Sequence, residues 1–126
     1  YGLDFNNKIR RALTIGGPTF IHSIDPCPKG WDYDPKYSHE LGMLSIETGI
    51  WVQYEIIEGE LTLNGPSRAI AKGIRKRKPV EDYLMRQGRF AHFTPEDLQH
   101  FQNKVDESWE KWWLPGVIPI SASQEE

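Results

Sequence analysis

The feature that most constrains the fold of this chain is a short apolar segment, residues 19–24, which follows a helix-forming stretch through a tight turn. Its sequence Thr-Phe-Ile-His-Ser-Ile is rich in β-branched and aromatic residues and comes after Gly-Gly-Pro, so it predicts a short buried β-strand. Residues 4–14 predict an amphipathic helix with Asp4 as its N-cap. Because a helix, a tight turn and a strand form half of a βαβ unit, we expect an α/β fold with a parallel sheet.

The loop that leaves this predicted strand, residues 24–31, contains the only cysteine of the chain, Cys27. In α/β proteins such a loop is where functional groups are commonly placed. Pro26 and Pro28 flank the cysteine and restrict the backbone on both sides. One thiol cannot complete a metal or cluster site, so two interpretations stay open. Either Cys27 is a small buried apolar side chain, or it is one ligand of a site that is completed elsewhere.

Size and composition limit the classes of protein that fit. The 126 residues are enough for one domain with a modest core, and the net charge of −3 argues against a nucleic-acid partner. A single cysteine excludes an internal disulfide framework and fits a reducing, cytoplasmic compartment. No apolar run approaches the roughly 20 residues of a membrane span, so we expect no membrane partner. Because the chain begins with Tyr1 and reaches a helix almost at once, we interpret it as part of a longer protein.

The middle of the chain predicts a helix, a hairpin and a basic segment. Residues 38–48 have helical spacing and are followed by a glycine, and residues 51–57 and 60–63 predict a β-hairpin with a two-residue loop. Residues 64–78 contain six cations, which we interpret as a solvated surface loop. The alternative is a docking surface for an acidic partner or for the phosphates of a cofactor.

The last third predicts helices that pack against the rest of the molecule. Residues 79–87 predict a short helix, and Thr94 followed by proline and two acids is typical of a helix N-terminus. Residues 114–120 predict an extended arm, and residues 121–126 predict a frayed polar tail. Apolar residues recur along the long helix at steps of three and four and predict one packed stripe: Leu98, Phe101, Val105, Trp109 and Trp112.

Spacing alone assigns no catalytic motif. The four histidines do not pair with one another or with Cys27 at a spacing typical of metal ligands, and we interpret His22 as a buried histidine within the strand. The sequence lacks a glycine-rich phosphate loop, a nucleophile elbow and a zinc-protease helix motif. On this basis the chain is an α/β piece with one positioned cysteine.

Four stretches taken together are more specific. Residues 17–31 read Gly-Pro-Thr-Phe-Ile-His-Ser-Ile-Asp-Pro-Cys-Pro-Lys-Gly-Trp, and residues 46–51 read Ile-Glu-Thr-Gly-Ile-Trp. Residues 78–84 read Lys-Pro-Val-Glu-Asp-Tyr-Leu, and residues 87–90 read Gln-Gly-Arg-Phe. In this order they resemble the β subunit of the 2-oxoacid:ferredoxin oxidoreductases, of the pyruvate:ferredoxin oxidoreductase (pyruvate synthase) type.

The resemblance implies a fold and a set of cofactors. The fold class would be α/β, as the C-terminal portion of a thiamine diphosphate-binding parallel-sheet fold with a β-hairpin and a helical C-terminal extension. Residues 1–63 would end the thiamine diphosphate-binding domain, and residues 64–126 would pack on that domain or on partner subunits. Such subunits bind thiamine diphosphate with magnesium, mainly through residues outside this stretch, and a nearby 4Fe–4S cluster. Three cluster cysteines lie early in the subunit, and the fourth maps to Cys27.

The resemblance also implies a reaction. The parent enzyme would oxidatively decarboxylate a 2-oxoacid with coenzyme A and pass electrons through iron–sulfur clusters to ferredoxin. Pyruvate is the default substrate, while 2-oxoglutarate, branched-chain 2-oxoacids and oxalate stay open. No catalytic residue is assigned here; Cys27 is the single cofactor-binding and metal-binding candidate, and Trp31 and Ile24 would shield the cluster from water. The alternative is a subunit-interaction module in which residues 64–120 dock partner subunits and Cys27 is merely buried.

Overall fold

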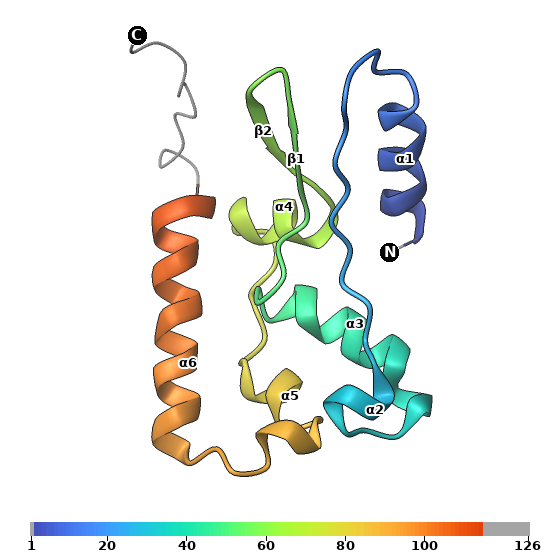
Figure 1. Cartoon of the computed structure of the whole chain (residues 1–126). Coiled ribbons are helices and arrows are strands. Elements are labelled where there is room, and N and C mark those ends of the chain that lie inside the picture. Colours follow the sequence, from blue (N-terminus) through green and yellow to red (C-terminus); the bar gives the residue numbers. More distant parts are fainter. Residues whose placement is uncertain (1, 115–126) are drawn as a thin grey trace, which may run out of the picture.

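The computed structural model of the chain describes residues 2–114, which form a helical body with one small hairpin (Figure 1). Two 3₁₀ turns, Pro35–Tyr37 and Gly88–Phe90, join the helices, and a π-helical segment, Trp109–Trp113, extends the last one. The longer elements follow in this order: α1 (Gly2–Ala12), α2 (Pro28–Trp31), α3 (Ser38–Glu47), β1 (Tyr54–Ile57), β2 (Glu60–Leu63), α4 (Gly65–Ala71), α5 (Glu81–Leu84) and α6 (Pro95–Ser108).

The core lies between α3, α4, α5 and α6. Its buried apolar side chains form one cluster that draws on residues from Leu41 to Trp109. Figure 1 shows α6 along one side of the molecule and α1 along the other, with α3, α4, α5 and the hairpin between them. No residue of α1 is buried, so the first helix lies outside this core. The members of the core cluster are Leu41, Leu44, Ile70, Val80, Tyr83, Leu84, Val105 and Trp109.

The predicted hairpin is confirmed. Strands β1 and β2 pair antiparallel, from Tyr54 opposite Leu63 to Ile57 opposite Glu60. The two loop residues between them, Glu58 and Gly59, have φ values of 52° and 83°. Positive φ at both central positions is the turn geometry that matches the natural twist of a two-stranded ribbon. The glycine in the loop therefore explains why the chain reverses at this point.

The predicted start of the long helix is also confirmed. Thr94 caps α6 through a capping box, in which its hydroxyl accepts a hydrogen bond from the Asp97 amide at 3.2 Å. The Asp97 carboxylate in turn accepts a hydrogen bond from the Thr94 amide at 2.9 Å. Pro95 occupies the first turn, where a backbone N–H has no helical partner.

The predicted apolar stripe along this helix is wrong at its last member. Trp109 is 1% exposed, but Trp112 is 53% exposed. The π-helical turn from Trp109 to Trp113 is wider than an α-helical turn, so the fourth residue after Trp109 returns to the packed face instead of the third. Trp113 accordingly faces Tyr54 of β1, with ring centroids 5.2 Å apart.

The strand predicted at residues 19–24 is wrong for the part of the chain that the structure describes. Figure 1 shows these residues as an extended trace outside any strand, and within residues 2–114 the sheet consists of β1 and β2 alone. His22 is exposed rather than buried; its ring meets Trp51 edge-on at 4.7 Å. A strand needs a neighbour for its backbone groups, and no described segment supplies one. The predicted parallel sheet is therefore not seen here.

Two further expectations need correction. The basic segment is not a loop throughout, because α4 forms within it and buries Ser67 and Ile70. Helix α1 begins at Gly2, so Asp4 lies in its first turn and pairs with Lys8 at 2.8 Å instead of acting as N-cap. Of the predicted arm, residues 115–120 lie outside the described residues, as does the predicted tail. None of the helices in residues 2–114 combines the length and apolar character that crossing a bilayer requires.

Candidate functional site

The Cys27 side chain caps the short helix α2. Its backbone is extended, with φ −101° and ψ 105°, and Pro28 begins the helical turn. The sulfur accepts a hydrogen bond from the Gly30 amide at 3.4 Å, and the Cys27 carbonyl accepts one from the Trp31 amide at 2.9 Å. The thiol is exposed, so the interpretation of Cys27 as a buried apolar residue does not describe this structure.

One side of the loop rests on α3. A methyl group placed on Gly42 would lie 3.8 Å from the ring of Pro26, which means that this proline packs directly against the helix backbone. A larger side chain at position 42 would therefore displace the loop one residue before the cysteine. The proline ring fixes its own φ angle and also restricts the residue before it.

The other side of the loop is held by residues 87–90. Asp32, with a left-handed φ of 56°, ends α2, and its carbonyl accepts a hydrogen bond from the Gly88 amide at 2.7 Å. A Cβ at position 88 would collide with the Asp32 side chain, so a larger residue here would force Asp32 to shift. Arg89 lies over the Trp31 ring at 4.3 Å, a cation–π contact.

Gln87 connects the cation–π contact between Arg89 and Trp31 to the core. It is 1% exposed, donates to the Tyr83 carbonyl at 2.8 Å and accepts from Arg89 at 2.9 Å. Trp31 packs edge-on against Tyr83, with centroids 6.4 Å apart. Trp31 thus joins the loop to the core cluster through Tyr83, and its predicted role as a shield for a cluster stays a prediction.

Residues 87–90 were not assigned a role by spacing, although their resemblance to a family motif marked them. The structure places them against the end of α2, which lies far earlier in the chain. Periodicity could not have found this contact, because nothing in a local pattern says which distant backbone a glycine approaches.

A second family motif, residues 46–51, meets the basic segment. Glu47, whose side chain is 9% exposed, pairs with Arg75 at 2.5 Å and with Lys78 at 2.8 Å. Burial alone would raise the pKa of Glu47, but the Lys78 ammonium and the Arg75 guanidinium outweigh it and hold the pKa below its usual value. The same carboxylate raises the pKa of Lys78.

Because Gly49 has no side chain, Trp109 at the C-terminal end of α6 can pack directly against this motif. The φ of Gly49 is +81°, and its carbonyl accepts a hydrogen bond from the Trp109 indole at 2.9 Å. Arg77 covers the Trp109 ring at 5.3 Å and pairs with Asp106 at 2.6 Å. Three cations of the basic segment therefore form ion pairs within the chain: Arg75 and Lys78 with Glu47 of α3, and Arg77 with Asp106 of α6. These ion pairs hold the basic segment against both helices.

The thiol of Cys27 belongs to no metal-binding cluster of side chains in the part of the chain that the structure describes. Among residues 2–114, no group of three or more His, Cys, Asp or Glu side chains could hold a metal ion. What the loop does offer is one accessible sulfur on a short, doubly anchored turn with a backbone N–H directed at it. A single thiolate with an N–H donor is suited to ligate an iron–sulfur cluster whose other ligands come from elsewhere.

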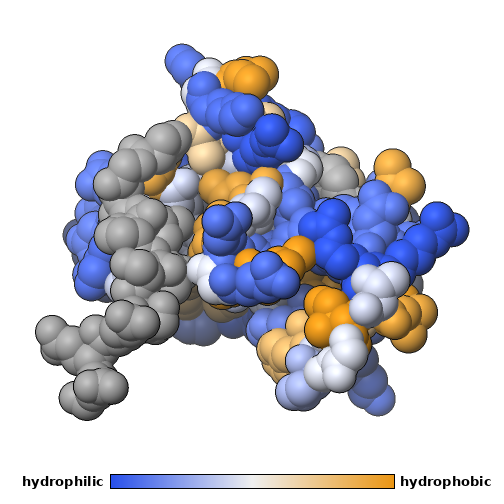
Figure 2. All heavy atoms as spheres, turned by 90° about the horizontal axis from the view of Figure 1, so that it is seen from above, coloured by the Kyte–Doolittle hydropathy of each residue, from blue (hydrophilic) through white to orange (hydrophobic). Residues whose placement is uncertain are grey.

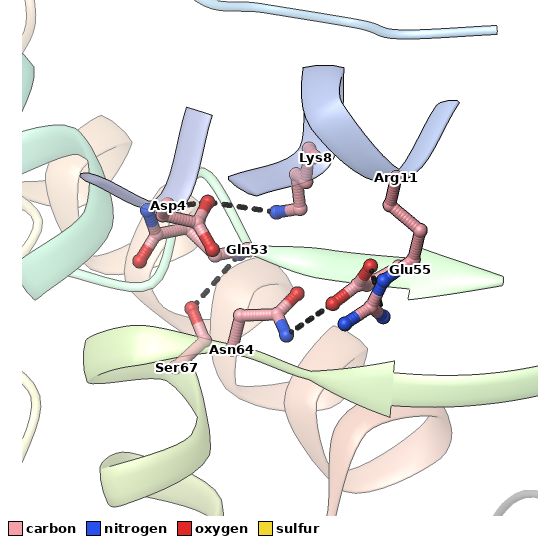
Figure 3. Close-up of polar contacts among 7 residues, drawn as sticks. All are labelled: Asp4, Lys8, Arg11, Gln53, Glu55, Asn64 and Ser67. Atoms are coloured by element: carbon pink, nitrogen blue, oxygen red, sulfur yellow. Dashed lines mark hydrogen bonds and ion pairs between the residues drawn. The ribbon is translucent and has the colours of Figure 1, made fainter. Parts of the chain in front are cut away.

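A large hollow lies beside α1, and Figure 3 shows polar contacts between residues that line it. It measures about 1250 Å³ and is lined by α1, residues 18–25, part of α3 and residues 49–58. Polar contacts cross it: Arg11 pairs with Glu55 at 2.9 Å, and Gln53 donates to Asp4 at 3.4 Å. On the hairpin side, Asn64 donates to Glu55 at 2.8 Å.

Comparison with known proteins gives a consistent set of relatives, although no family model matches the chain. The chain is 42% identical to pyruvate synthase subunit PorB of Methanocaldococcus jannaschii over 107 residues, which are 85% of the chain and 34% of that protein. It is 34% identical to PorB of Pyrococcus furiosus over 130 residues, with 93% and 39% covered. It is 35% identical to ketoisovalerate oxidoreductase subunit VorB of the same organism over 111 residues, with 88% and 34% covered.

The chain thus spans between a third and two fifths of the length of these relatives. The matched region covers most of the chain, between 85% and 93% of it in these relatives. On this evidence the chain belongs to the family of pyruvate synthase and ketoisovalerate oxidoreductase β subunits, as a segment of such a subunit.

Proposed function

We propose that this chain is part of the β subunit of a 2-oxoacid:ferredoxin oxidoreductase and that Cys27 supplies one ligand to a 4Fe–4S cluster. The observation that carries the proposal is the exposed thiol of Cys27. Its loop is held on one side by α3 and on the other by residues 87–90. A buried structural cysteine needs no such anchoring. An accessible thiol that must meet ligands from elsewhere needs a fixed position.

The residues of this chain would act on the cluster through position and hydrogen bonding. The Cys27 thiolate would bind iron, and the Gly30 N–H, already directed at the sulfur, would stabilise its negative charge and raise the reduction potential. Pro26 and Pro28 would restrict the backbone of the loop, so that the loop keeps its conformation when the cluster is oxidised or reduced. Trp31 would exclude water from one side of it.

The other cofactor belongs to the rest of the subunit. Thiamine diphosphate with magnesium supplies the electron sink that allows the carbon–carbon bond of a 2-oxoacid to break. We propose that the chain is the C-terminal portion of the domain that binds it. The partners would be the other subunits of the enzyme, coenzyme A and ferredoxin. Pyruvate is the proposed substrate because relatives named pyruvate synthase recur at the higher identities.

The ligand assignment is tested in the assembled enzyme with Cys27→Ser and Cys27→Ala. We expect both variants to lose iron and labile sulfide equivalent to one cluster and to lose one electron paramagnetic resonance signal. The matched control is Lys29→Ala, an exposed change in the same loop that removes no ligand. Cysteine variants that keep the full iron content and unchanged spectra would show that Cys27 is not a ligand.

The substrate is tested separately. Turnover of the intact enzyme with pyruvate should exceed turnover with 2-oxoisovalerate by at least about tenfold in kcat/KM, the discrimination that a few methylenes in a pocket provide. A higher value for the branched acid would place the protein with the ketoisovalerate enzymes. Activity with 2-oxoglutarate or oxalate alone would contradict both.

The alternative function is a subunit-interaction module without chemistry. The basic segment is the observation that favours it, since Arg68, Lys72 and Lys76 are exposed and form no ion pair within the described residues. If Cys27 variants leave the clusters unchanged while charge reversal at Lys72 breaks the assembly, this second function is the correct one.

A further inference from the structure

Arg89 differs from the other arginines of the helical body in what holds it. The three arginines between residues 75 and 86 each form an ion pair with an acid. Arg89 forms no ion pair with an acid of residues 2–114. Its Nε donates to the Gln87 carboxamide at 2.9 Å, and its guanidinium carbon lies 4.3 Å from the centre of the Trp31 ring and 4.7 Å from that of Phe90. These partners are neutral, so the positive charge is held in place without being neutralised by them.

The groups that hold Arg89 are themselves fixed by the core. Gln87 is buried and donates to the Tyr83 carbonyl, and Trp31 packs edge-on against the buried Tyr83 ring. The charge of Arg89 already acts on this neighbour, because burial raises the pKa of Tyr83 and the guanidinium opposes that rise. Fixing a long cationic side chain costs rotamer entropy, and here the ring and the carboxamide supply the restraint.

Exposed polar and charged side chains are common on this molecule, so exposure does not distinguish Arg89. The end that carries the hairpin tip and the turn after α1 has hydrophilic side chains over much of its surface, with apolar ones among them (Figure 2). Water and ions screen charges on such a surface. Arg89 is also exposed, but its guanidinium lies over an aromatic ring of the loop that carries Cys27. Its position, rather than its charge alone, distinguishes it.

Two backbone contacts connect Arg89 to the site of the thiol. The Trp31 amide, below the guanidinium in this stack, donates to the Cys27 carbonyl at 2.9 Å. The Gly88 amide, next to Arg89, donates to the Asp32 carbonyl at 2.7 Å. Asp32 ends the same short helix, α2, that the Cys27 side chain caps. The charge of Arg89 is therefore attached to both ends of the turn that presents the sulfur.

We propose that the Arg89 guanidinium tunes the reduction potential of the cluster bound at Cys27, by placing an un-neutralised positive charge beside it that favours the reduced form. This role depends on Cys27 being a cluster ligand, as proposed above. A 4Fe–4S cluster gains one negative charge on reduction, and its potential depends on the charges around it. A nearby cation without an acidic partner stabilises the reduced form more than the oxidised form. Arg89 supplies no ligand and acts through space.

A redox titration of the assembled enzyme, followed by electron paramagnetic resonance, tests this role. The signal to follow is the one that Cys27→Ser removes. We expect Arg89→Gln to keep the iron and labile sulfide content and to lower the equilibrium constant for one-electron reduction about tenfold, which is a fall of about 59 mV. Arg89→Lys keeps the charge and should stay close to the wild type. The matched control is Arg86→Gln, which removes a cation that Glu40 already neutralises and should leave the potential unchanged.

An unchanged potential in Arg89→Gln would overturn the proposal, because the guanidinium would then be neutralised by the rest of the subunit or lie too far from the cluster. Equal falls in Arg89→Gln and Arg89→Lys would also overturn it, since the shape of the side chain would then matter and not its charge. So would equal falls in Arg89→Gln and Arg86→Gln.

The test still decides if Arg89→Gln assembles no cluster. If Arg89→Lys then holds the cluster, the positive charge stabilises the anionic cluster and the proposal stands; if neither variant holds it, the proposal fails. Failure of the ligand role is seen separately, because Cys27→Ser would then remove no signal.

Discussion

At the scale of single residues, two glycines with left-handed backbones show what only the tertiary structure decides. Gly49 and Gly59 have nearly the same φ, 81° and 83°. A Cβ on Gly59 would meet nothing within 4 Å, whereas a Cβ on Gly49 would collide with the Trp109 indole and lie 2.7 Å from Arg77 Cδ. The backbone requirement is shared, and the packing requirement belongs to Gly49 alone.

We expect Gly59→Ala to lower the free energy of unfolding by about 1–2 kcal/mol, the cost of a left-handed alanine. Gly49→Ala should lower it by at least about 3 kcal/mol, because overpacking adds to the same backbone cost. Urea unfolding of the two variants measures both values. Equal losses would mean that Trp109 moves aside without penalty.

The ion pairs of Glu47 predict a dependence on pH. Because the folded-state pKa of Glu47 lies below its usual value of 4.5, its contribution to stability is complete above that value and is lost as the pH falls through the folded pKa. Glu47→Gln should lower the free energy of unfolding by about 1–2 kcal/mol at neutral pH, since its two cationic partners are half exposed.

The difference between the wild type and Glu47→Gln should shrink steadily as the pH falls below 4.5 and through the folded-state pKa of Glu47. The control is Glu107→Gln, which removes an exposed pair with Lys104 and should cost no more than about 0.5 kcal/mol. Urea unfolding as a function of pH gives both comparisons. A difference that persists undiminished at low pH would show that the charge of Glu47 does not matter.

At the scale of elements, local sequence determines the elements whose stabilising contacts are local. The hairpin needs a glycine in a two-residue loop, and the start of α6 needs a capping residue followed by proline and acids; both were predicted at the observed positions. The segment at residues 19–24 has equally strong strand composition and forms no strand here, because a strand also needs a neighbour. The prediction of Trp112 as a packed residue fails for a related reason: a π-turn changes which residue returns to the buried face.

The cap of α6 gives a test at this scale. Thr94→Ala removes the side-chain acceptor of the Asp97 amide and should lower the free energy of unfolding by about 1 kcal/mol. Thr94→Ser keeps the hydroxyl and should stay close to the wild type. Circular dichroism during thermal unfolding follows both. An unchanged Thr94→Ala variant would mean that packing of Trp109 alone holds the helix.

At the scale of the whole molecule, the chain consists of a packed body and an arm. The body unites α3, α4, α5 and α6 around one core, and the family motifs at residues 46–51, 78–84 and 87–90 all contribute to it. The arm, α1 with residues 13–25, meets the body through polar and edge-on aromatic contacts. Cys27 lies where the two join, so its position depends on both.

The sequence by itself determined the hairpin, the capped start of α6, the helix that begins at Ser38 and the cysteine that sets the candidate site, because each depends on residues that are neighbours in the chain. Its resemblance to a family is also supported by the relatives. Only the tertiary structure decided that Gly88 approaches Asp32, that Gly49 admits Trp109, and that the basic segment serves Glu47 and Asp106. These contacts join residues that are distant in sequence, and a local pattern carries no information about which distant surface will cover it.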